Sequence, residues 1–252
     1  MSEFILELYS EEIPPNLQIN ARNDLQEKFK NSLKEENIKY GSLSSFSSPT
    51  RLTIFLKDFS DKIKTPSKEI RGPKVGVMDD IINNFLKAQN LSRKDLVEKQ
   101  NDKGNFYYVK TKSKEVLTSE ILKKIVVNSI ASIRWKKSMR WSDTDLLWGR
   151  PLRSILAIYN KQILDFSYGH LKAGDCTIIE KDLDTKIKKV TNFKDYQKLL
   201  LSNNITLNHE DREKKIIRKF ESFYKLKNFK SHYDIKLLKE VTNIVEDPYV
   251  LL

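Results

Sequence analysis

The sequence has little of several features that mark specialised protein classes. It contains a single cysteine, Cys176, so no disulfide can form within the chain, and its 7 Gly and 7 Pro among 252 residues exclude a collagen-like or low-complexity composition. Apolar runs such as Ile125–Val127 are far too short to cross a bilayer. The first residues, Met-Ser-Glu-Phe, lack the basic and apolar regions of a secretory signal. We therefore expect a globular, cytoplasmic protein that does not enter a membrane.

Motifs for nucleotides and metals are also missing. Gly72–Gly76 has neither the length nor the Lys-Ser/Thr ending of a phosphate-binding loop, and His170, His209 and His232 stand apart from one another. We expect no metal site and no cofactor in this chain. Cys176 follows His170 by six residues, but a lone cysteine is more often a small buried residue than a nucleophile.

Two carboxylates, Glu11 and Glu12, lie between an expected strand and an expected helix. They have the chemistry for acid–base catalysis or for holding an amine. Negative side chains near the start of a helix are also stabilised by its dipole, by about 0.3–1 kcal/mol. We favour this second interpretation because helix caps are far commoner than catalytic pairs.

Positive charge is in excess and is concentrated in one segment. Lys and Arg number 46 against 34 Asp and Glu, which gives a net charge of +12, and residues 110–140 carry nine basic and two acidic residues. Such an excess favours a polyanionic partner. The candidate RNA contacts are Lys123, Lys124, Arg134, Lys136, Lys137 and Arg140.

The basic segment runs into Ile133–Tyr159, which contains all 3 tryptophans of the chain. In one interpretation the cations neutralise phosphates while Trp135 or Trp141 stacks on a base, which is worth roughly 1–3 kcal/mol per base. In the other, the tryptophans fill the core and the charges form a solvated face. Because tryptophan is highly buried on average, we expect at least two of the three to be core residues.

Hydrophobic periodicity predicts an α+β fold, with short mixed sheets, flanking helices and a mostly helical C-terminal third. Strands are predicted at 4–9, 42–46, 52–59, 105–111 and 152–159, the last forming a hairpin with 163–168. Helices are predicted at 15–33, 79–88, 93–97, 115–133, 193–201, 210–225 and 233–245, and a linker or long loop at 61–77. These elements suggest three domains: a β-α-β-β unit at 1–65, an α+β domain at 66–190 and a helical region at 191–252.

Seven short motifs occur in an order that resembles one known family, the β subunit of the bacterial glycyl-tRNA synthetase built from separate α and β chains. The motifs begin with Leu6-Glu-Leu-Tyr-Ser-Glu-Glu-Ile-Pro-Pro15, Ser48-Pro-Thr-Arg-Leu52 and Ile70-Arg-Gly-Pro73. They continue with Lys137-Ser-Met-Arg-Trp141, Arg150-Pro-Leu-Arg-Ser-Ile155, Gly169-His170 and Glu240–Leu251. The motif positions that we single out are Glu11, Glu12, Pro14, Pro15, Pro49, Arg51, Arg71, Gly72, Pro73, Met139, Trp141, Arg150, Pro151, Gly169 and His170. The family's G-H-R-F is Gly169-His-Leu-Lys172 here, a departure from the pattern.

The resemblance implies a part of glycine–tRNA ligase that binds tRNA and assembles with an α subunit into a heterotetramer of two α and two β subunits. It places glycine activation, with ATP and Mg²⁺, on the α subunit. It also implies a longer chain, because the family's β subunit continues into an HD-like helical region and an anticodon-binding domain. The sequence therefore resembles the N-terminal part of that subunit. Arg51, Arg71 and Arg150 lie in turn contexts where guanidinium groups often bind backbone carbonyls, so we expect structural roles for them.

Two alternatives stay open at this point. The chain is a hydrolase that removes the amino acid from mischarged tRNA, with Glu11, Glu12 or His170 near its site, or it is a subunit-interaction module that does not contact RNA. A similarity of fold to an editing domain would not establish the first, because a fold does not carry a site with it.

Overall fold

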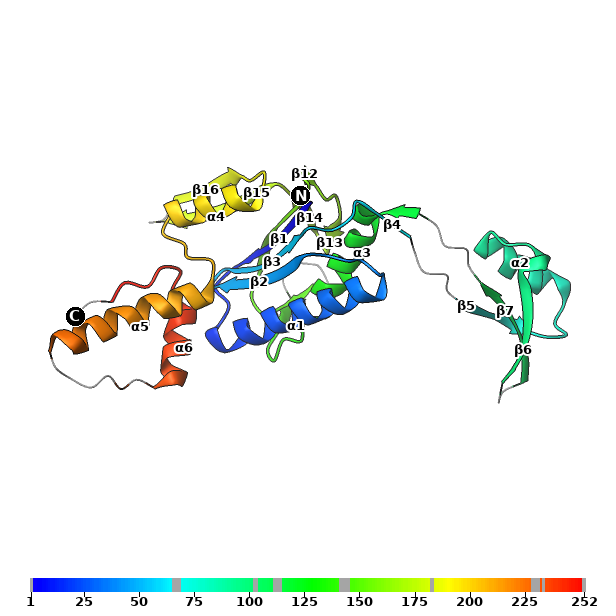
Figure 1. The fold of residues 1–252 in the computed structure, drawn as a ribbon, viewed down its shortest axis with the longest axis horizontal. Coiled ribbons are helices and arrows are strands. Elements are labelled where there is room, and N and C mark those ends of the chain that lie inside the picture. Colours follow the sequence, from blue (N-terminus) through cyan, green and yellow to red (C-terminus); the bar gives the residue numbers. More distant parts are fainter. Residues whose placement is uncertain are drawn as a thin grey trace. The chain divides into compact units, whose positions relative to one another are not determined.

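The computed structural model describes residues 2–64, 69–101, 104–110, 115–140, 146–181, 184–227, 232 and 234–250. Its helices and strands form several short sheets without a repeated strand–helix–strand order, which confirms the predicted α+β class (Figure 1). The chain divides into two compact units. Residues 1–61 and 118–252 form the main unit, and residues 62–117 form the inserted unit.

The main unit is built on one mixed sheet with the strand order β13-β14-β11-β1-β3-β2. All neighbours are antiparallel except the pair β11 and β14, which is parallel. Its strands are β1 (Glu3–Ser10), β2 (Ser42–Ser48), β3 (Arg51–Lys57), β11 (Leu152–Tyr159), β13 (Ser167–Tyr168) and β14 (Leu171–Gly174), and β12 (Gln162–Ile163) pairs with β11. The predicted hairpin is therefore correct only at its turn, since Ser167 and Tyr168 pair with β14 and not with β11.

Helices and one hairpin pack on this sheet or on one another (Figure 1). The helices are α1 (Pro15–Glu35), α3 (Thr118–Ala131), α4 (Phe193–Ser202), α5 (His209–Leu226) and α6 (Ile235–Ile244), and the hairpin is β15 (Cys176–Lys181) with β16 (Asp184–Lys189). Helix α1 packs against β2, β3 and α3 on one face, and α4 packs with β15 on the other. The helical character predicted for the C-terminal residues is confirmed by α4, α5 and α6.

Strand β1 lies in the middle of the sheet and is buried on both faces. Phe4 points to α1, where its ring stacks on Phe29 with 6.1 Å between the centroids. Ile5 points to the other face and belongs to an apolar cluster with Tyr196 of α4. Because side chains alternate along a strand, Glu7 shares the face of Ile5 and is 0% exposed. A charge at the centre of an apolar layer needs hydrogen-bond or ion-pair partners.

The first helix follows the predicted period of four. Pro15 occupies its first position, where a missing N–H removes no helical hydrogen bond. All five residues of the predicted apolar stripe are buried: Leu17, Ala21, Leu25, Phe29 and Leu33. Burial of this stripe against the sheet fixes the helix in place.

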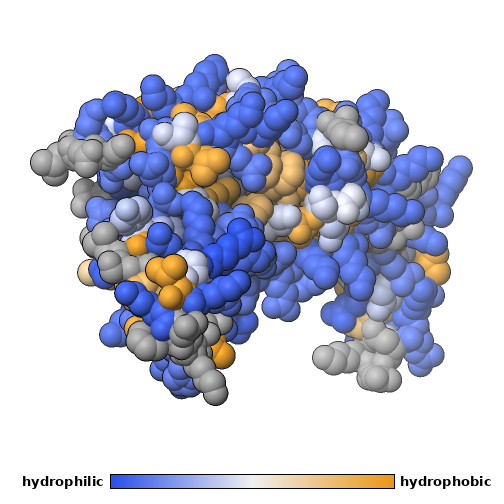
Figure 2. Space-filling model, turned by 60° about the vertical axis from the view of Figure 1, so that its left-hand side comes forward, coloured by the Kyte–Doolittle hydropathy of each residue, from blue (hydrophilic) through white to orange (hydrophobic). Residues whose placement is uncertain are grey.

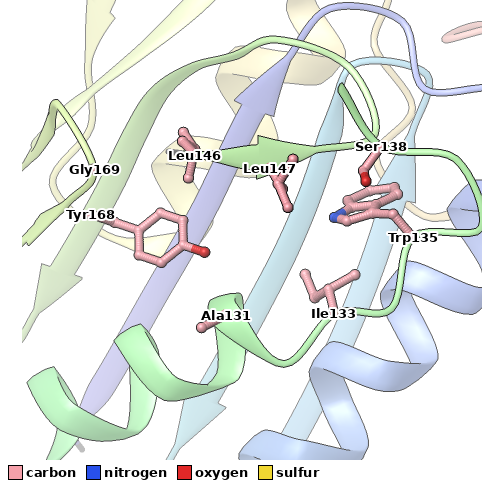
Figure 3. Close-up of a pocket in the computed structure, with 8 residues that line it drawn as sticks. All are labelled: Ala131, Ile133, Trp135, Ser138, Leu146, Leu147, Tyr168 and Gly169. Atoms are coloured by element: carbon pink, nitrogen blue, oxygen red, sulfur yellow. The ribbon is translucent and has the colours of Figure 1, made fainter. Parts of the chain in front are cut away.

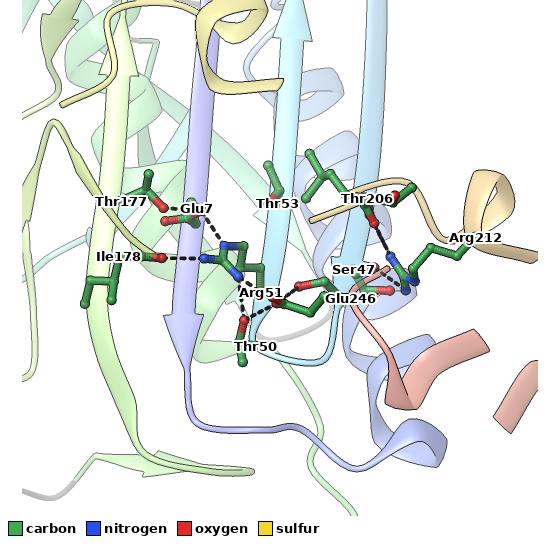
Figure 4. Close-up of polar contacts among 12 residues, drawn as sticks. Glu7, Ser47, Thr50, Arg51, Thr53, Thr177, Ile178, Thr206, Arg212 and Glu246 are labelled. Atoms are coloured by element: carbon green, nitrogen blue, oxygen red, sulfur yellow. Dashed lines mark hydrogen bonds and ion pairs between the residues drawn. The ribbon is translucent and has the colours of Figure 1, made fainter. Parts of the chain in front are cut away.

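Arg212 joins α5 to the sheet and to α6. The residue is 0% exposed, and its guanidinium donates hydrogen bonds of 2.7–3.1 Å to the carbonyl oxygens of Thr206, Leu207, Ser47 and Thr242 (Figure 4). Burial lowers its pKa to about 10, so the side chain is charged at neutral pH. Five N–H groups suit this role because several carbonyls can be satisfied at once.

The inserted unit contains structure where a linker was predicted. Its elements are β4 (Lys62–Lys64), β5 (Glu69–Lys74), α2 (Asp79–Gln89), the 3-10 turn η1 (Arg93–Asp95), β6 (Leu96–Asn101), β7 (Gly104–Lys110) and β8 (Glu115–Leu117). The linker prediction for 61–77 is wrong, because β4 pairs with β8 and β5 pairs with β7. The predicted helix at 115–133 begins only at Thr118, and its first three residues form β8.

The unit boundaries also differ from the three predicted domains. Strand β11, placed by sequence in the middle domain, pairs with β1 along its length. In the segment after α6, Glu246 accepts hydrogen bonds from Arg51 of β3 and from the amide of Thr206 before α5. Residues 1–61 and 191–252 therefore belong to one unit together with residues 118–190 of the middle segment. Periodicity along the chain does not reveal such distant pairing.

Hydrophilic side chains cover most of the face in Figure 2, and apolar side chains gather in separate patches. Helix α6 carries several exposed apolar residues, among them Ile235, Leu237 and Ile244. Among the described residues, no helix has both the length and the apolar character needed to cross a membrane.

Candidate nucleic-acid interface

Arg51 is a buried ion-pairing residue and does not face solvent. Its side chain is 1% exposed. Its Nε atom lies 3.2 Å from Glu7 Oε2, and its Nη1 atom lies 2.7 Å from Glu246 Oε1 (Figure 4). The guanidinium also donates to Thr50 Oγ1 and to the carbonyl oxygen of Ile178. Burial alone would lower the pKa of Arg51, but the two carboxylates outweigh it and the pKa is raised. Arg51 is therefore structural, as its turn context indicated.

Glu7 completes this buried network. Its Oε2 atom accepts hydrogen bonds from Arg51, from Thr177 Oγ1 at 2.9 Å and from the Tyr196 hydroxyl at 2.5 Å, while Oε1 has no partner among the described residues. Burial, and then the carboxylate of Glu7, raise the pKa of Tyr196 well above its usual range. The network connects β1, β3, β15, α4 and the segment after α6, so it fixes the register of elements that are distant in sequence.

The loop Glu11–Pro15 is held by its backbone. The amide of Glu11 donates to the Pro151 carbonyl at 3.0 Å, and the amide of Ile13 donates to the Pro49 carbonyl at 2.7 Å. Three of the motifs singled out in the sequence thus meet at one end of the sheet. Pro14 is the N-cap of α1, and the first turn contains no acidic residue. The capping interpretation of Glu11 and Glu12 is therefore wrong, and both side chains are exposed.

The remaining acid–base candidates are also exposed or inert. His170 is exposed, which leaves its imidazole and the carboxylates of Glu11 and Glu12 in ordinary solvent. Cys176 donates to Asp175 Oδ1 at 3.3 Å, and burial raises the pKa of its thiol, opposite to what a nucleophile needs. No group of three or more metal-ligating side chains occurs within the described part of the chain. None of these features favours hydrolytic chemistry.

The motif residues of the inserted unit have packing roles. Arg71 lies over the ring of Phe106, with 4.4 Å from its guanidinium carbon to the centroid. Gly72 leaves room for α2, because a Cβ atom there would lie 2.7 Å from a carbon of Phe85. Pro73 is half-buried beside it.

The tryptophan segment forms the wall of a cavity of about 450 Å³ in the main unit (Figure 3). Its residues come from the end of α3 and the following loop, from the strands β9 (Met139–Arg140) and β10 (Leu147–Trp148) or next to them, and from the turn between β13 and β14. The lining residues are Ala131, Ile133, Trp135, Ser138, Leu146, Leu147, Tyr168 and Gly169. Figure 3 shows the hydroxyl of Tyr168 and the indole nitrogen of Trp135 pointing into the space between them.

The three tryptophans have different environments. Trp148 is 1% exposed and belongs to the core, and the half-buried Trp135 packs against it with 4.9 Å between ring centroids. Gly149 permits this packing, since a Cβ atom there would lie 2.4 Å from the Trp135 ring. The Nε1 atoms of both rings are buried and have no hydrogen-bond partner among the described residues. Trp141 lies outside the described residues.

Two of the six predicted cations lie near a carboxylate of another residue. Lys123 forms an ion pair of 2.8 Å with Glu120, and Arg134 lies 4.0 Å from Asp24 with a side chain that is 89% exposed. Arg140 is exposed on β9, where it pairs with Leu147. Lys124, Lys136 and Lys137 are exposed, and no ion pair joins them to another described residue.

Two of the exposed lysines are next to the cavity along the chain. Lys136 and Lys137 connect Trp135 to Ser138, both of which line it. Lys124 lies seven residues before Ala131 on the exposed side of α3, a spacing that keeps both on one side of the helix and about 10 Å apart along its axis. Three exposed lysines therefore lie on the segments that form one side of this cavity.

Sequence reasoning missed Glu7, Glu246, Ser138 and Tyr168. The sequence did contain an indication of the role of Glu7. A glutamate within the apolar stretch Phe4–Tyr9 indicates a buried charge that needs a partner. Glu246 lies more than 190 residues from Arg51 along the chain, and nothing local indicates their contact. Arg150, the remaining motif arginine, is half-buried next to Pro151.

Comparison with known proteins adds an independent finding. Residues 4–252 match the model of a family described as glycyl-tRNA synthetase beta subunit. The glycine–tRNA ligase beta subunit of Rickettsia akari (strain Hartford) is 35% identical over 252 residues, which cover 100% of this chain and 38% of that protein. The protein of the same name from Rickettsia prowazekii (strain Madrid E) has the same identity and coverage. The chain thus spans well under half the length of these curated relatives.

Proposed function

The chain belongs to the glycyl-tRNA synthetase β-subunit family, and from this premise we propose that it is a part of glycine–tRNA ligase that binds tRNA and assembles with an α subunit. Glycine activation, with ATP and Mg²⁺, then takes place on the α subunit. The protein supplies a surface that holds the tRNA while the other chain makes the ester bond. The proposed assembly contains two α and two β subunits and works in the cytoplasm.

The observation that supports tRNA binding is the group of exposed lysines at the aromatic cavity. Phosphate oxygens are the main source of affinity in protein–nucleic acid complexes, and lysines that lack protein partners are available to them. Lys124, Lys136 and Lys137 have this property, whereas Lys123 is engaged by Glu120. The inferred contact surface is therefore smaller than the sequence prediction of six cations and is centred on the loop after α3.

Charge reversal tests this surface. The double variant Lys136→Glu/Lys137→Glu is expected to bind tRNA more weakly and with a flatter dependence on salt, because each lost phosphate contact lowers the slope of log K against log[salt] by roughly 0.7–0.9. Binding is measured by fluorescence anisotropy of labelled tRNA between low and moderate salt. The control is Lys186→Glu/Lys188→Glu, which changes the net charge by the same amount at two exposed lysines of β16, one of which forms a surface ion pair with Asp184.

The comparison of the two double variants tests whether Lys136 and Lys137 contact the tRNA. Equal salt slopes for wild type and for Lys136→Glu/Lys137→Glu would refute the surface, and equal losses for both double variants would mean that only net charge matters. Repeating the titration with an α subunit present, and following co-elution of the two chains, separates tRNA binding from assembly. Co-elution without any tRNA binding would favour the interaction module over the tRNA-binding function.

A further inference from the structure

We propose that the cavity between Trp135 and Tyr168 binds one unpaired nucleobase of an RNA strand. This inference rests on the proposed tRNA-binding function and assigns a particular subsite to it. The base enters between the two aromatic side chains while its phosphates remain outside, next to Lys136 and Lys137.

The walls of the cavity suit a flat ring. Trp135 and Tyr168 come from segments more than thirty residues apart and face the same space (Figure 3). Ile133, Leu146 and Leu147 give the remainder an apolar lining. Every base has a π-face that can stack on an aromatic side chain, so recognition of this kind tolerates different sequences.

The cavity also contains polar groups in need of partners. Trp135 Nε1 is buried without a hydrogen-bond acceptor among the described residues, and buried donors normally have one. It points toward the cavity near Leu147, whose side chain is 52% exposed. A ring nitrogen or carbonyl oxygen of a base would accept this hydrogen. The hydroxyls of Tyr168 and Ser138 provide further donors and acceptors for the edge of the base.

The neighbouring charges distinguish a nucleotide from other flat ligands. Lys136 and Lys137 follow Trp135 directly and are exposed, so an anionic group attached to the stacked ring lies close to them. A neutral aromatic ligand would leave these cations unused. Bases within a duplex are stacked on one another and cannot enter a cavity, so the occupant is a base from a loop, a bulge or a single-stranded end.

The experiment titrates the chain with a short single-stranded RNA and with the same sequence in a blunt duplex, and follows tryptophan fluorescence. The single strand is expected to quench the emission of Trp135, and the duplex is expected to leave it unchanged. The contribution of Trp135 is obtained by subtracting the titration of Trp135→Phe. The variant Trp135→Leu, which removes the stacking surface, is expected to bind the single strand about 5- to 150-fold more weakly.

A second variant keeps the proposal testable if Trp135→Leu fails to fold. Tyr168→Leu removes the opposite wall without touching the packing between Trp135 and Trp148. It is expected to weaken binding of the single strand while leaving the salt slope as in wild type, because no phosphate contact is lost. Reversal of Lys136 and Lys137 has the opposite signature, a flattened slope with quenching retained at low salt.

The outcomes separate the two proposals. Salt-dependent tRNA binding without quenching of Trp135, and with wild-type affinity in Trp135→Leu and Tyr168→Leu, would overturn the base subsite and leave the tRNA-binding function in place. No binding of tRNA by the chain, alone or with an α subunit, would overturn both.

Discussion

Replacement of Arg51 by methionine is expected to destabilise the main unit strongly. Arg51 and Glu7 are 1% and 0% exposed and lie 3.2 Å apart, so water cannot replace the lost guanidinium. Removing one partner of a buried ion pair costs about 3–5 kcal/mol because it leaves the other charge uncompensated. Glu7 is the charge that matters here, since Glu246 is 26% exposed and can be solvated. The Oε1 atom of Glu7 already lacks a hydrogen-bond partner among the described residues.

This loss is large compared with the stability of a domain, which is about 5–15 kcal/mol. In a unit of this size it corresponds to a fall of roughly 6–20 °C in Tm. Urea unfolding followed by tryptophan fluorescence measures the free energy of unfolding of the main unit selectively. Residues 135, 141 and 148 are the only tryptophans of the sequence, and all lie outside the inserted unit 62–117. Arg153→Met is the matched control: Arg153 pairs with Glu180 at the surface, with side chains 41% and 42% exposed, and its loss should cost about 0–1 kcal/mol.

A double-mutant cycle identifies the cause. Glu7→Gln/Arg51→Met removes both charges, so it should be less destabilised than Arg51→Met alone, with an interaction free energy of about 1–3 kcal/mol. If the effects of the two single substitutions simply add, or if Arg51→Met costs no more than Arg153→Met, the buried charge does not determine stability and the reasoning is refuted.

Two further predictions concern packing and pH. Gly149→Ala places a Cβ atom where the Trp135 ring lies 2.4 Å away, so it should displace that ring and shift tryptophan emission to longer wavelength; unchanged emission would show that the ring has room to move. Burial, and then the charges of Arg22 and Arg212, lower the pKa of His209 from 6.5 to about 4. The unfolded chain therefore binds a proton that the folded chain excludes as pH falls from about 6.5 to 4, and stability should decrease over this range. His209→Gln should show a weaker decrease in the free energy of unfolding between pH 7 and 5, and equal pH dependence in the two proteins would contradict the shift.

Local patterns were sufficient for the longer elements. The apolar step of four from Leu17 to Leu33 and the proline at the start predicted α1, and alternating side chains predicted β1. The segment 61–77 was misread because Pro66, Gly72, Pro73 and Gly76 are typical of loops. Ile70 is in fact paired with Val109 of β7, and this partner lies too far along the chain to be detected by periodicity.

The candidate site was predictable in part. Composition identified Lys136 and Lys137 and the tryptophans beside them, because basic and aromatic residues together are typical of nucleic-acid binding. Composition did not distinguish Lys123 from Lys124. Lys123 forms an ion pair with Glu120, three positions before it, and is therefore less available to a phosphate. Composition also gave no indication of Tyr168, which lines the same cavity as Trp135 although more than thirty residues separate them in the chain.

The sequence by itself determined the family, the excess of positive charge and the principal helices, since motif order, composition and periodicity are properties of neighbouring residues. The tertiary structure decided which arginines and lysines are free. Arg51 and Arg212 are as basic in sequence as Lys136, yet they are buried among carboxylates and carbonyl oxygens, while Lys136 is exposed. A side chain's availability to a partner depends on what the fold packs around it, and those neighbours come from distant parts of the chain.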